Sequence, residues 1–191
     1  MELLQSKIEK DGVVISEDIL NVDGIIHHMV DPALMEAVGE DIAAHFADRG
    51  ITKVVTVESS GISPAIMAAK SLKVPMVILK KEPSKILHAD LIQTMVTSYT
   101  KEMSYELTLA HRFIQPEDHV LIVDDFLSNG ETATAAIRLL RHCHATIAGV
   151  AVLIEKTFQP GREKLEDSGV EVYALTRIKK LTGDQILFEK D

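Results

Sequence analysis

The chain has 191 residues, enough for one compact domain that buries roughly 70% of its unfolded surface on folding. Hydrophobic residues make up 46% and charged residues 26%, which is usual for a globular protein and excludes a fibrous or disordered chain. The formal net charge of -9 argues against nucleic acid as a partner, because that binding relies on clustered lysines and arginines. We expect one domain over residues 1–191.

Cysteine usage and hydropathy predict the environment of the protein. Cys143 is the only cysteine, so no intrachain disulfide forms, and the first ten residues lack the apolar stretch of a secretory signal. No apolar run approaches the roughly 20 residues that a membrane span needs. We therefore predict a cytoplasmic protein that binds neither nucleic acid nor membrane.

The N-terminal part begins with a short amphipathic segment and then loses its periodicity. Residues 13–29 mix apolar, acidic and histidine residues, which predicts irregular structure or short strands. The pair Asp31-Pro32 predicts the start of a helix, because an aspartate caps it, proline suits its first turn, and apolar residues follow at helical spacing to Phe46. Gly50 is predicted to stop that helix.

Two short apolar runs, at 52–57 and 75–79, predict buried strands. The polar loop 58–61 and a helical stretch that continues through Ala69 lie between them. A crossover of this kind implies that the two strands pair in parallel. Residues 82–110 break the pattern with a polar loop and alternating residues, which predicts a mobile antiparallel hairpin.

The C-terminal half resumes the alternation of strand and helix. The predicted elements are strands at 120–123, 148–154 and 170–175 and helices at 133–140 and 161–168. A polar tail is expected after Leu175. The predicted fold class is therefore α/β, with a doubly wound parallel sheet flanked by helices.

The stretch from Val120 to Thr132 carries the most specific chemistry. A buried strand delivers Asp124 and Asp125 to the carboxyl edge of the sheet, where ligands of open α/β sheets bind. Adjacent carboxylates suit a ribose, whose neighbouring hydroxyls donate charge-assisted hydrogen bonds. The loop that follows enters a helix, whose N-terminal amides can hold a phosphate. A hairpin turn at Asn129-Gly130 is the alternative, although a helical pattern follows rather than a second strand.

The segment Val120-Leu-Ile-Val-Asp-Asp-Phe-Leu-Ser-Asn-Gly-Glu-Thr132 resembles the phosphoribosyl pyrophosphate (PRPP) signature of type I phosphoribosyltransferases. The resemblance covers nearly the whole chain. The xanthine-specific bacterial branch of the family is similar to this chain over residues 13–35, 52–64, 118–132 and 154–162. Asn129 departs from the small hydroxyl residue of the wider family but fits that branch. The resemblance implies the type I fold, with a small hood made of residues 1–30 and the C-terminal segment.

The resemblance also implies roles for individual residues around PRPP. Asp124 and Asp125 would be catalytic and face the ribose, and the 5′-phosphate region would be bound by Ser128, Asn129, Gly130, Glu131 and Thr132. The loop Ser59-Ser60-Gly61 would cradle pyrophosphate, often through an unusual non-proline peptide bond, whereas the residues alone favour ordinary strand-to-helix capping. Lys80 and Lys81 would reach the pyrophosphate of this subunit or a neighbour, or form a solvated edge.

The candidate residues for the base are Leu20, His27, Phe126, Lys156 and Phe158. Lys156 ends an apolar strand at the same sheet edge as Asp124, and the resemblance implies that it donates to the purine O6. Leu20 and His27 match hood positions that contact xanthine, but His27 replaces an amide or hydroxyl residue. A neutral imidazole there can still donate one hydrogen bond to the O2 or N3 region. Either phenylalanine could stack on the purine or simply pack.

The resemblance implies an enzyme of purine salvage that transfers the phosphoribosyl group from PRPP to N9 of xanthine, giving xanthosine monophosphate (XMP) and pyrophosphate. Mg²⁺ is expected to arrive with PRPP, without direct protein ligands, and a homodimer is expected. Two alternatives remain open: a PRPP-sensing regulatory domain of the purine-repressor type, and an enzyme that prefers guanine or hypoxanthine. The run His142-Cys143-His144 lacks the spacing of metal ligands.

Overall fold

The computed structural model describes residues 1–81, 90–98 and 103–189, which form a central six-stranded sheet in the order β10-β9-β8-β7-β3-β4. The strands of this sheet are β3 (Lys53–Val57), β4 (Met76–Leu79), β7 (His119–Leu127), β8 (Thr146–Lys156), β9 (Val172–Thr182) and β10 (Gln185–Phe188). All neighbours pair in parallel except β10, which pairs antiparallel with β9 at one edge.

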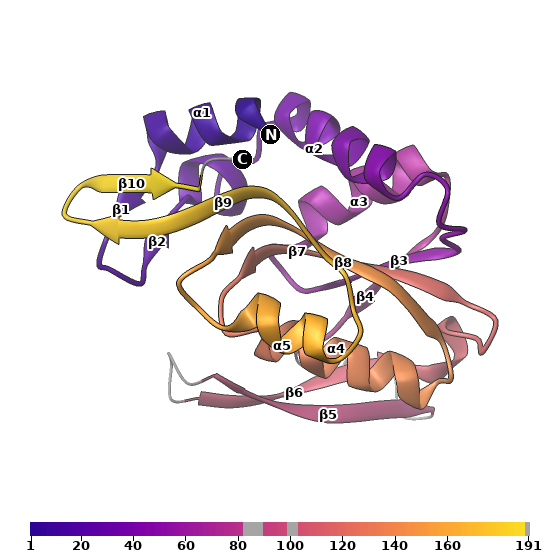
Figure 1. Cartoon of the computed structure of the whole chain (residues 1–191). Helices are drawn as coiled ribbons and strands as arrows, with labels where there is room; N and C mark the ends of the chain where they lie inside the picture. The colour runs from indigo at the N-terminus through magenta and orange to yellow at the C-terminus, as the bar shows by residue number, and fades with distance from the viewer. Residues whose placement is uncertain (82–89, 99–102, 190–191) are drawn as a thin grey trace.

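Helices cover both faces of this sheet (Figure 1). One face carries α1 (Glu2–Asp11), α2 (Pro32–His45) and α3 (Ile62–Leu72), and the other carries α4 (Glu131–His142), α5 (Gly161–Asp167) and the hairpin of β5 (Leu91–Ser98) and β6 (Met103–Ala110). Each face of the sheet has its own hydrophobic core, and successive residues of a strand pack into the two cores in turn. Leu121 packs in one cluster and Ile122 in the other. The predicted α/β class with a parallel sheet is confirmed.

The predicted cap of α2 is confirmed in atomic detail. The Asp31 carboxylate accepts hydrogen bonds from the backbone amides of Ala33 at 3.0 Å and Leu34 at 3.3 Å, and Pro32 occupies the first turn. These bonds satisfy amide groups that a helix N-terminus otherwise leaves without partners. The helix ends at His45, somewhat before Gly50.

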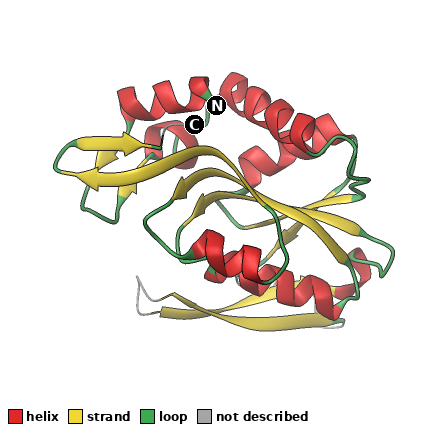
Figure 2. Ribbon diagram, viewed as in Figure 1, coloured by secondary structure: helices red, strands yellow, loops and turns green. Residues whose placement is uncertain are grey.

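The N-terminal residues 13–29 form two short strands, as predicted, and a helical turn that the sequence did not predict. Strand β1 (Val13–Val14) pairs antiparallel with β2 (Leu20–Asn21), and a π-helix, η1 (Asp23–His27), follows. Figure 2 shows these segments near the β9–β10 hairpin, and their apolar side chains share one cluster with Ile178 and Leu181 of β9. Residues 13–29 therefore pack beside β9 and β10 at one edge of the main sheet, and we call residues 13–29 together with the β9–β10 hairpin the hood.

Two strands are longer than predicted, and both differences have a physical reason. The loop expected from Asp124 begins only after Leu127, because β7 keeps its pairing with β8 as far as the Leu127–Glu155 register. The polar tail expected after Leu175 is wrong, because β9 runs on to Thr182 and returns as β10. The aspartate pair therefore lies inside a strand, where its backbone is fixed.

The hairpin predicted for residues 82–110 is confirmed for the part that the structure describes. Strands β5 and β6 pair antiparallel from Leu91–Ala110 to Ser98–Met103, and a short 3-10 helix, η2 (His111–Phe113), follows. Residues 82–89 and 99–102 lie outside the described residues, and the mobility of the hairpin stays a prediction. In the described parts of the chain, no helix combines the length and the apolar character that crossing a membrane requires.

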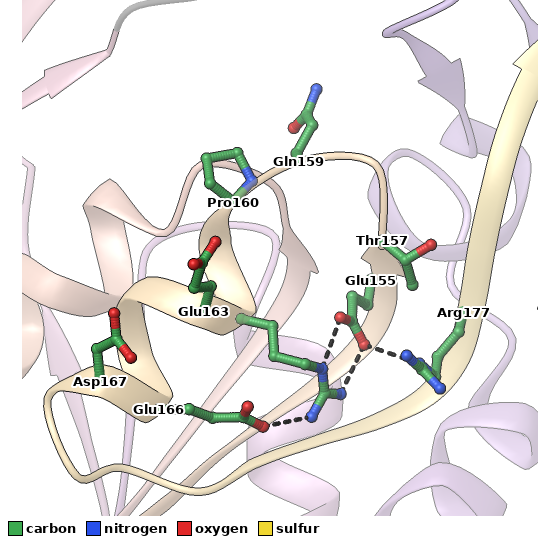
Figure 3. A pocket seen from close by; sticks show the side chains of 9 residues that line it. Glu155, Thr157, Gln159, Pro160, Glu163, Glu166, Asp167 and Arg177 are labelled. Carbon is green, nitrogen blue, oxygen red and sulfur yellow. Dashed lines mark hydrogen bonds and ion pairs between the residues drawn. The ribbon is translucent and has the colours of Figure 1, made fainter.

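A buried ion-pair cluster joins the end of β8 to α5 and β9 (Figure 3). Glu155 is only 2% exposed, and it accepts hydrogen bonds from Arg162 Nε at 2.7 Å and from Arg177 Nε at 3.3 Å. Arg162 also donates to the exposed Glu166 at 2.9 Å. These groups line an open pocket of about 290 Å³, whose walls come from β8, α5, β9 and the loop before α5.

We predict that Glu155→Ala lowers the free energy of unfolding by about 2–3 kcal/mol, because it leaves two arginines beside a buried gap. Glu166→Ala is the matched control, since it removes an exposed partner of the same Arg162, and its cost should stay within about 0.5 kcal/mol. Urea unfolding of both variants measures the difference. Equal losses of unfolding free energy in the two variants would contradict the idea that Glu155 stabilises the fold because it is buried.

Candidate functional site

The predicted site residues gather at the carboxyl edge of the sheet, because consecutive parallel strands end there. The contributing segments are Lys80–Lys81 after β4, the loop 58–61 after β3, residues 124–132 in and after β7, and Lys156 at the end of β8. Helices α3 and α4, which follow β3 and β7, lie on opposite faces of the sheet. Ligands of open α/β sheets bind at such a switch point.

Two adjacent carboxylates form the centre of this edge. The backbone amide of Asp125 donates to Asp124 Oδ1 at 3.0 Å. Burial, and then the charge of Asp125, raise the pKa of Asp124 well above its ordinary value. Burial opposes ionisation of Asp125 too, but hydrogen bonds from His27, Asp124 and Ser60 outweigh it and lower the pKa of Asp125. Of the two carboxyl groups, Asp124 is therefore the one that binds a proton more readily, and Asp125 is the one whose ionised form is favoured.

The loop after β3 lies directly against this pair. The Glu58–Ser59 peptide bond is cis. A Cβ atom on Gly61 would lie 2.8 Å from Asp124 Oδ1 and 2.3 Å from Thr56 Oγ1, so a larger residue does not fit. The loop 58–61 and the aspartates, which are far apart in the sequence, thus form one continuous surface.

The loop after β7 is held in shape by α5. Gly130 has a φ of 76°, in the left-handed region that favours glycine, and it begins α4. The amide of Gly161 donates to the carbonyl oxygen of Ser128 at 2.9 Å, and Lys164 Nζ pairs with Glu131 Oε1 at 2.5 Å. The loop therefore presents the N-terminal end of α4 in a defined shape.

The two predicted lysines differ in their surroundings. Lys80 Nζ donates to Glu58 Oε2 at 2.9 Å, and the backbone amide of Lys81 donates to Glu58 Oε1 at 2.6 Å. The Lys81 ammonium lies 5.3 Å from the centre of the Tyr105 ring, and its charge acts on Asp124. Lys81 is therefore near enough to Asp124 for its charge to act there, whereas Lys80 is engaged by Glu58.

Three of the five residues predicted for the base come together. Lys156 Nζ lies 5.3 Å from the centre of the Phe126 ring, and the His27 and Phe126 rings are 6.2 Å apart. Burial lowers the pKa of Lys156, whose ammonium donates to the Asp18 carbonyl oxygen at 2.5 Å.

The other two residues predicted for the base lie in different surroundings. Leu20 is buried in the hood core, and Phe158 is 40% exposed in the loop after β8.

His27 joins the hood to the sheet edge. Its Nε2 lies 2.8 Å from Asp125 Oδ2, and its Nδ1 lies 3.3 Å from Asp23 Oδ1. The hydrogen bond to Asp125 raises the pKa of His27, although burial opposes it, so the charged imidazole is favoured. Both ring nitrogens of His27 therefore already face carboxylates.

Sequence reasoning missed two of these partners. Asp23 precedes His27 by four residues, a spacing at which side chains meet on a helical turn, so a helix prediction here would have found it. Asp18 acts through its carbonyl oxygen, which every residue has, and no side-chain pattern could reveal that contact.

Comparisons with known proteins identify relatives of the whole chain. Residues 29–180 match the family model described as the phosphoribosyl transferase domain. A xanthine phosphoribosyltransferase of Agathobacter rectalis is 61% identical over 188 residues, which cover 98% of each chain. Xanthine phosphoribosyltransferase 1 of Clostridium botulinum is 51% identical over 190 residues, the full length of both chains.

Solved structures show the same architecture. The adenine phosphoribosyltransferase of Thermoanaerobacter pseudethanolicus superposes with a TM-score of 0.76 at 23% identity, covering 91% of this chain and 99% of that one. The Trypanosoma brucei enzyme, in complex with AMP, pyrophosphate and ribose-5-phosphate, has a TM-score of 0.77 at 22% identity and covers 91% and 79% of the two chains. At these identities the likeness shows the fold.

We predict that Asp125→Asn lowers the pKa of His27 towards the ordinary histidine value of about 6.5, because it removes the charge that favours the imidazolium. In the unaltered protein the contact stabilises the fold fully below that ordinary value, and the stabilisation is lost as the pH rises through the raised pKa. An NMR titration of the His27 ring measures this. The exposed control Asp48→Asn should leave the pKa unchanged, and an unchanged pKa in Asp125→Asn would contradict the assignment.

Proposed function

Since the chain belongs to the phosphoribosyltransferase family, we propose that it transfers the 5-phosphoribosyl group from PRPP to N9 of xanthine, giving XMP and pyrophosphate. The observation that carries the proposal is the pair of adjacent carboxyl groups of Asp124 and Asp125 at the sheet edge, followed directly by the loop that leads into α4. The identity of 61% to a xanthine phosphoribosyltransferase over nearly the whole chain supports the base.

The ribose 5-phosphate half of PRPP fits residues 124–132. The carboxylate of Asp125, whose pKa is lowered, accepts hydrogen bonds from the ribose hydroxyls, and Asp124 offers a second carboxyl group beside it. The 5′-phosphate meets the loop Ser128-Asn129-Gly130-Glu131-Thr132, at the positive end of α4. The hydroxyls of Ser128 and Thr132 supply further donors.

The pyrophosphate half fits the loop Ser59-Ser60-Gly61 and the lysines that follow β4. Lys81 supplies positive charge beside the carboxylate pair, and Lys80 would have to exchange Glu58 for the ligand. Mg²⁺ is proposed to arrive with PRPP, bound by the substrate phosphates and without direct protein ligands. When bound with PRPP, the metal neutralises charge on the departing pyrophosphate.

The reaction forms a bond between N9 of the base and C1′ of the ribose, breaks the bond from C1′ to pyrophosphate, inverts C1′ and releases the N9 proton. By analogy with glycosyl transfer, positive charge develops on the ribose ring in the transition state. The carboxylate of Asp125 is already ionised, so it can stabilise that charge without first losing a proton. The hairpin β5–β6 is the proposed lid that excludes water.

The base is proposed to lie between the sheet edge and the hood. Lys156 donates to O6, Phe126 offers a ring face, and His27 lies on the C2 side. His27 must release one carboxylate to donate to xanthine O2, since both of its ring nitrogens are engaged. Leu20 would shape the hood from within its core, and exposed Phe158 would move to stack on the base.

A homodimer and a cytoplasmic location are proposed from the family resemblance. A single free cysteine, Cys143, is consistent with a reducing compartment.

A pyrophosphate-release assay with PRPP, Mg²⁺ and each of xanthine, guanine and hypoxanthine tests the proposal. We expect release with all three bases and the highest kcat/KM with xanthine. PRPP binding without pyrophosphate release would indicate a sensor of the purine-repressor type. A higher kcat/KM with guanine or hypoxanthine would show that xanthine is not the preferred base.

We predict that Asp124→Asn and Asp125→Asn each lower kcat at least about tenfold, equivalent to roughly 1.4 kcal/mol of transition-state stabilisation. The reason is the loss of a carboxyl group that hydrogen-bonds the ribose in the proposed complex. Steady-state kinetics measures this, with the exposed Asp48→Asn as a control that should retain activity. Unchanged kinetics in both variants would remove the ribose assignment.

We predict that Lys156→Met lowers kcat/KM for all three 6-oxopurines together, because each loses the same donor at O6. His27→Ala should instead narrow the gap between xanthine and the other two bases, since only the C2 substituent differs among them. A comparison of kcat/KM for the three bases measures both effects. Lys179→Met, which changes an exposed lysine of β9, is the control, and unaltered base ratios in His27→Ala would disprove the hood assignment.

A further inference from the structure

The hairpin strand β6 places one tyrosine against the loop after β7. The hydroxyl of Tyr105 forms a hydrogen bond with Thr132 Oγ1 at 3.2 Å. Thr132 lies in the first turn of α4, within the proposed 5′-phosphate loop. One polar group of the hairpin therefore contacts one end of the proposed PRPP site.

The ring of the same tyrosine contacts the other end. The ammonium of Lys81 lies 5.3 Å from the centre of the Tyr105 ring, within the distance at which a cation is attracted to an aromatic face. Lys81 also acts electrostatically on Asp124. A single side chain thus touches a residue proposed for the 5′-phosphate and a residue proposed for the pyrophosphate.

The position of Tyr105 is fixed by its surroundings. The ring packs against the core cluster beneath α4, opposite Val96, which is 2% exposed. Thr108 and Lys80 exchange backbone hydrogen bonds at 2.8 Å and 2.9 Å, which ties β6 to the end of β4. The hairpin is also joined to α4 where Arg138 Nη1 donates to Thr94 Oγ1 at 2.7 Å.

We propose that Tyr105 is a positioning residue that holds the 5′-phosphate loop and the pyrophosphate lysine at the spacing that PRPP requires. This inference rests on the proposed function. The hydroxyl orients Thr132, and the ring orients Lys81, so the two effects belong to different atoms of one side chain. Ribose 5-phosphate carries the 5′-phosphate of PRPP without its pyrophosphate, and inorganic pyrophosphate lacks the 5′-phosphate. The effects of the hydroxyl and of the ring can therefore be measured separately.

Calorimetry with ribose 5-phosphate and with magnesium pyrophosphate tests this on the full chain. Tyr105→Phe removes the hydroxyl and keeps the ring, so affinity for ribose 5-phosphate should fall roughly threefold to tenfold while pyrophosphate affinity stays within about twofold. Tyr105→Leu removes both and should weaken both ligands, with the loss for pyrophosphate roughly twofold to fivefold. The KM for PRPP should rise more than kcat falls in both variants.

Thr94→Val is the matched control, because it breaks another hydrogen bond between the hairpin and α4 outside the site, and both affinities should stay unchanged. Equal weakening of both ligands in Tyr105→Phe, or no change in either, would overturn the inference. The difference between the affinity changes for the two ligands in Tyr105→Phe tests the inference even if Tyr105→Leu does not fold. Absence of binding by the unaltered protein would instead overturn the proposed function, and with it this role for Tyr105.

Discussion

Two aspartates stand side by side in the half-buried part of β7, and their surroundings affect them in opposite ways. Neighbouring ionised carboxylates repel each other, and here burial and the charge of Asp125 raise the pKa of Asp124. Burial also opposes the ionisation of Asp125, but hydrogen bonds from groups that include His27 and Ser60 lower its pKa, while Gly61 lets the β3 loop approach Asp124. The protein thereby stabilises the ionised form of Asp125 with its own groups.

The sheet and the position of the candidate site residues at its edge were predictable because their signals are local. Apolar runs at β3, β7 and β8 mark buried strands, and the aspartates follow one such run directly. The carboxyl ends of parallel strands necessarily meet at one edge, so Lys156 and Asp124 are brought together without knowledge of side-chain geometry. The cap at Asp31 was predictable for the same reason, since donor and acceptor are two or three residues apart.

The hood was less predictable, because contacts between distant segments determine it. The π-helix η1 has no distinctive composition, and β10 exists only because β9 continues past Leu175 and offers it a partner. The charge state of His27 depends on Asp125, which is 98 residues away in the sequence. In the sequence, Tyr105 is one of several residues that alternate along a predicted strand. Its contact with Thr132 of α4 becomes visible only in the structure.

The hood is built from the two ends of the chain, whereas the proposed PRPP groups lie on and after β3, β4 and β7. On this assignment, selection can act on the two halves of the substrate separately, with His27 as the exception because it is hydrogen-bonded to Asp125. Substitutions elsewhere in residues 13–29 or in the β9–β10 hairpin can change the recognition of the base while the aspartate pair and the phosphate loop keep their geometry. Such a division favours the evolution of new base preferences on one conserved sugar-phosphate scaffold, with divergence concentrated near the termini.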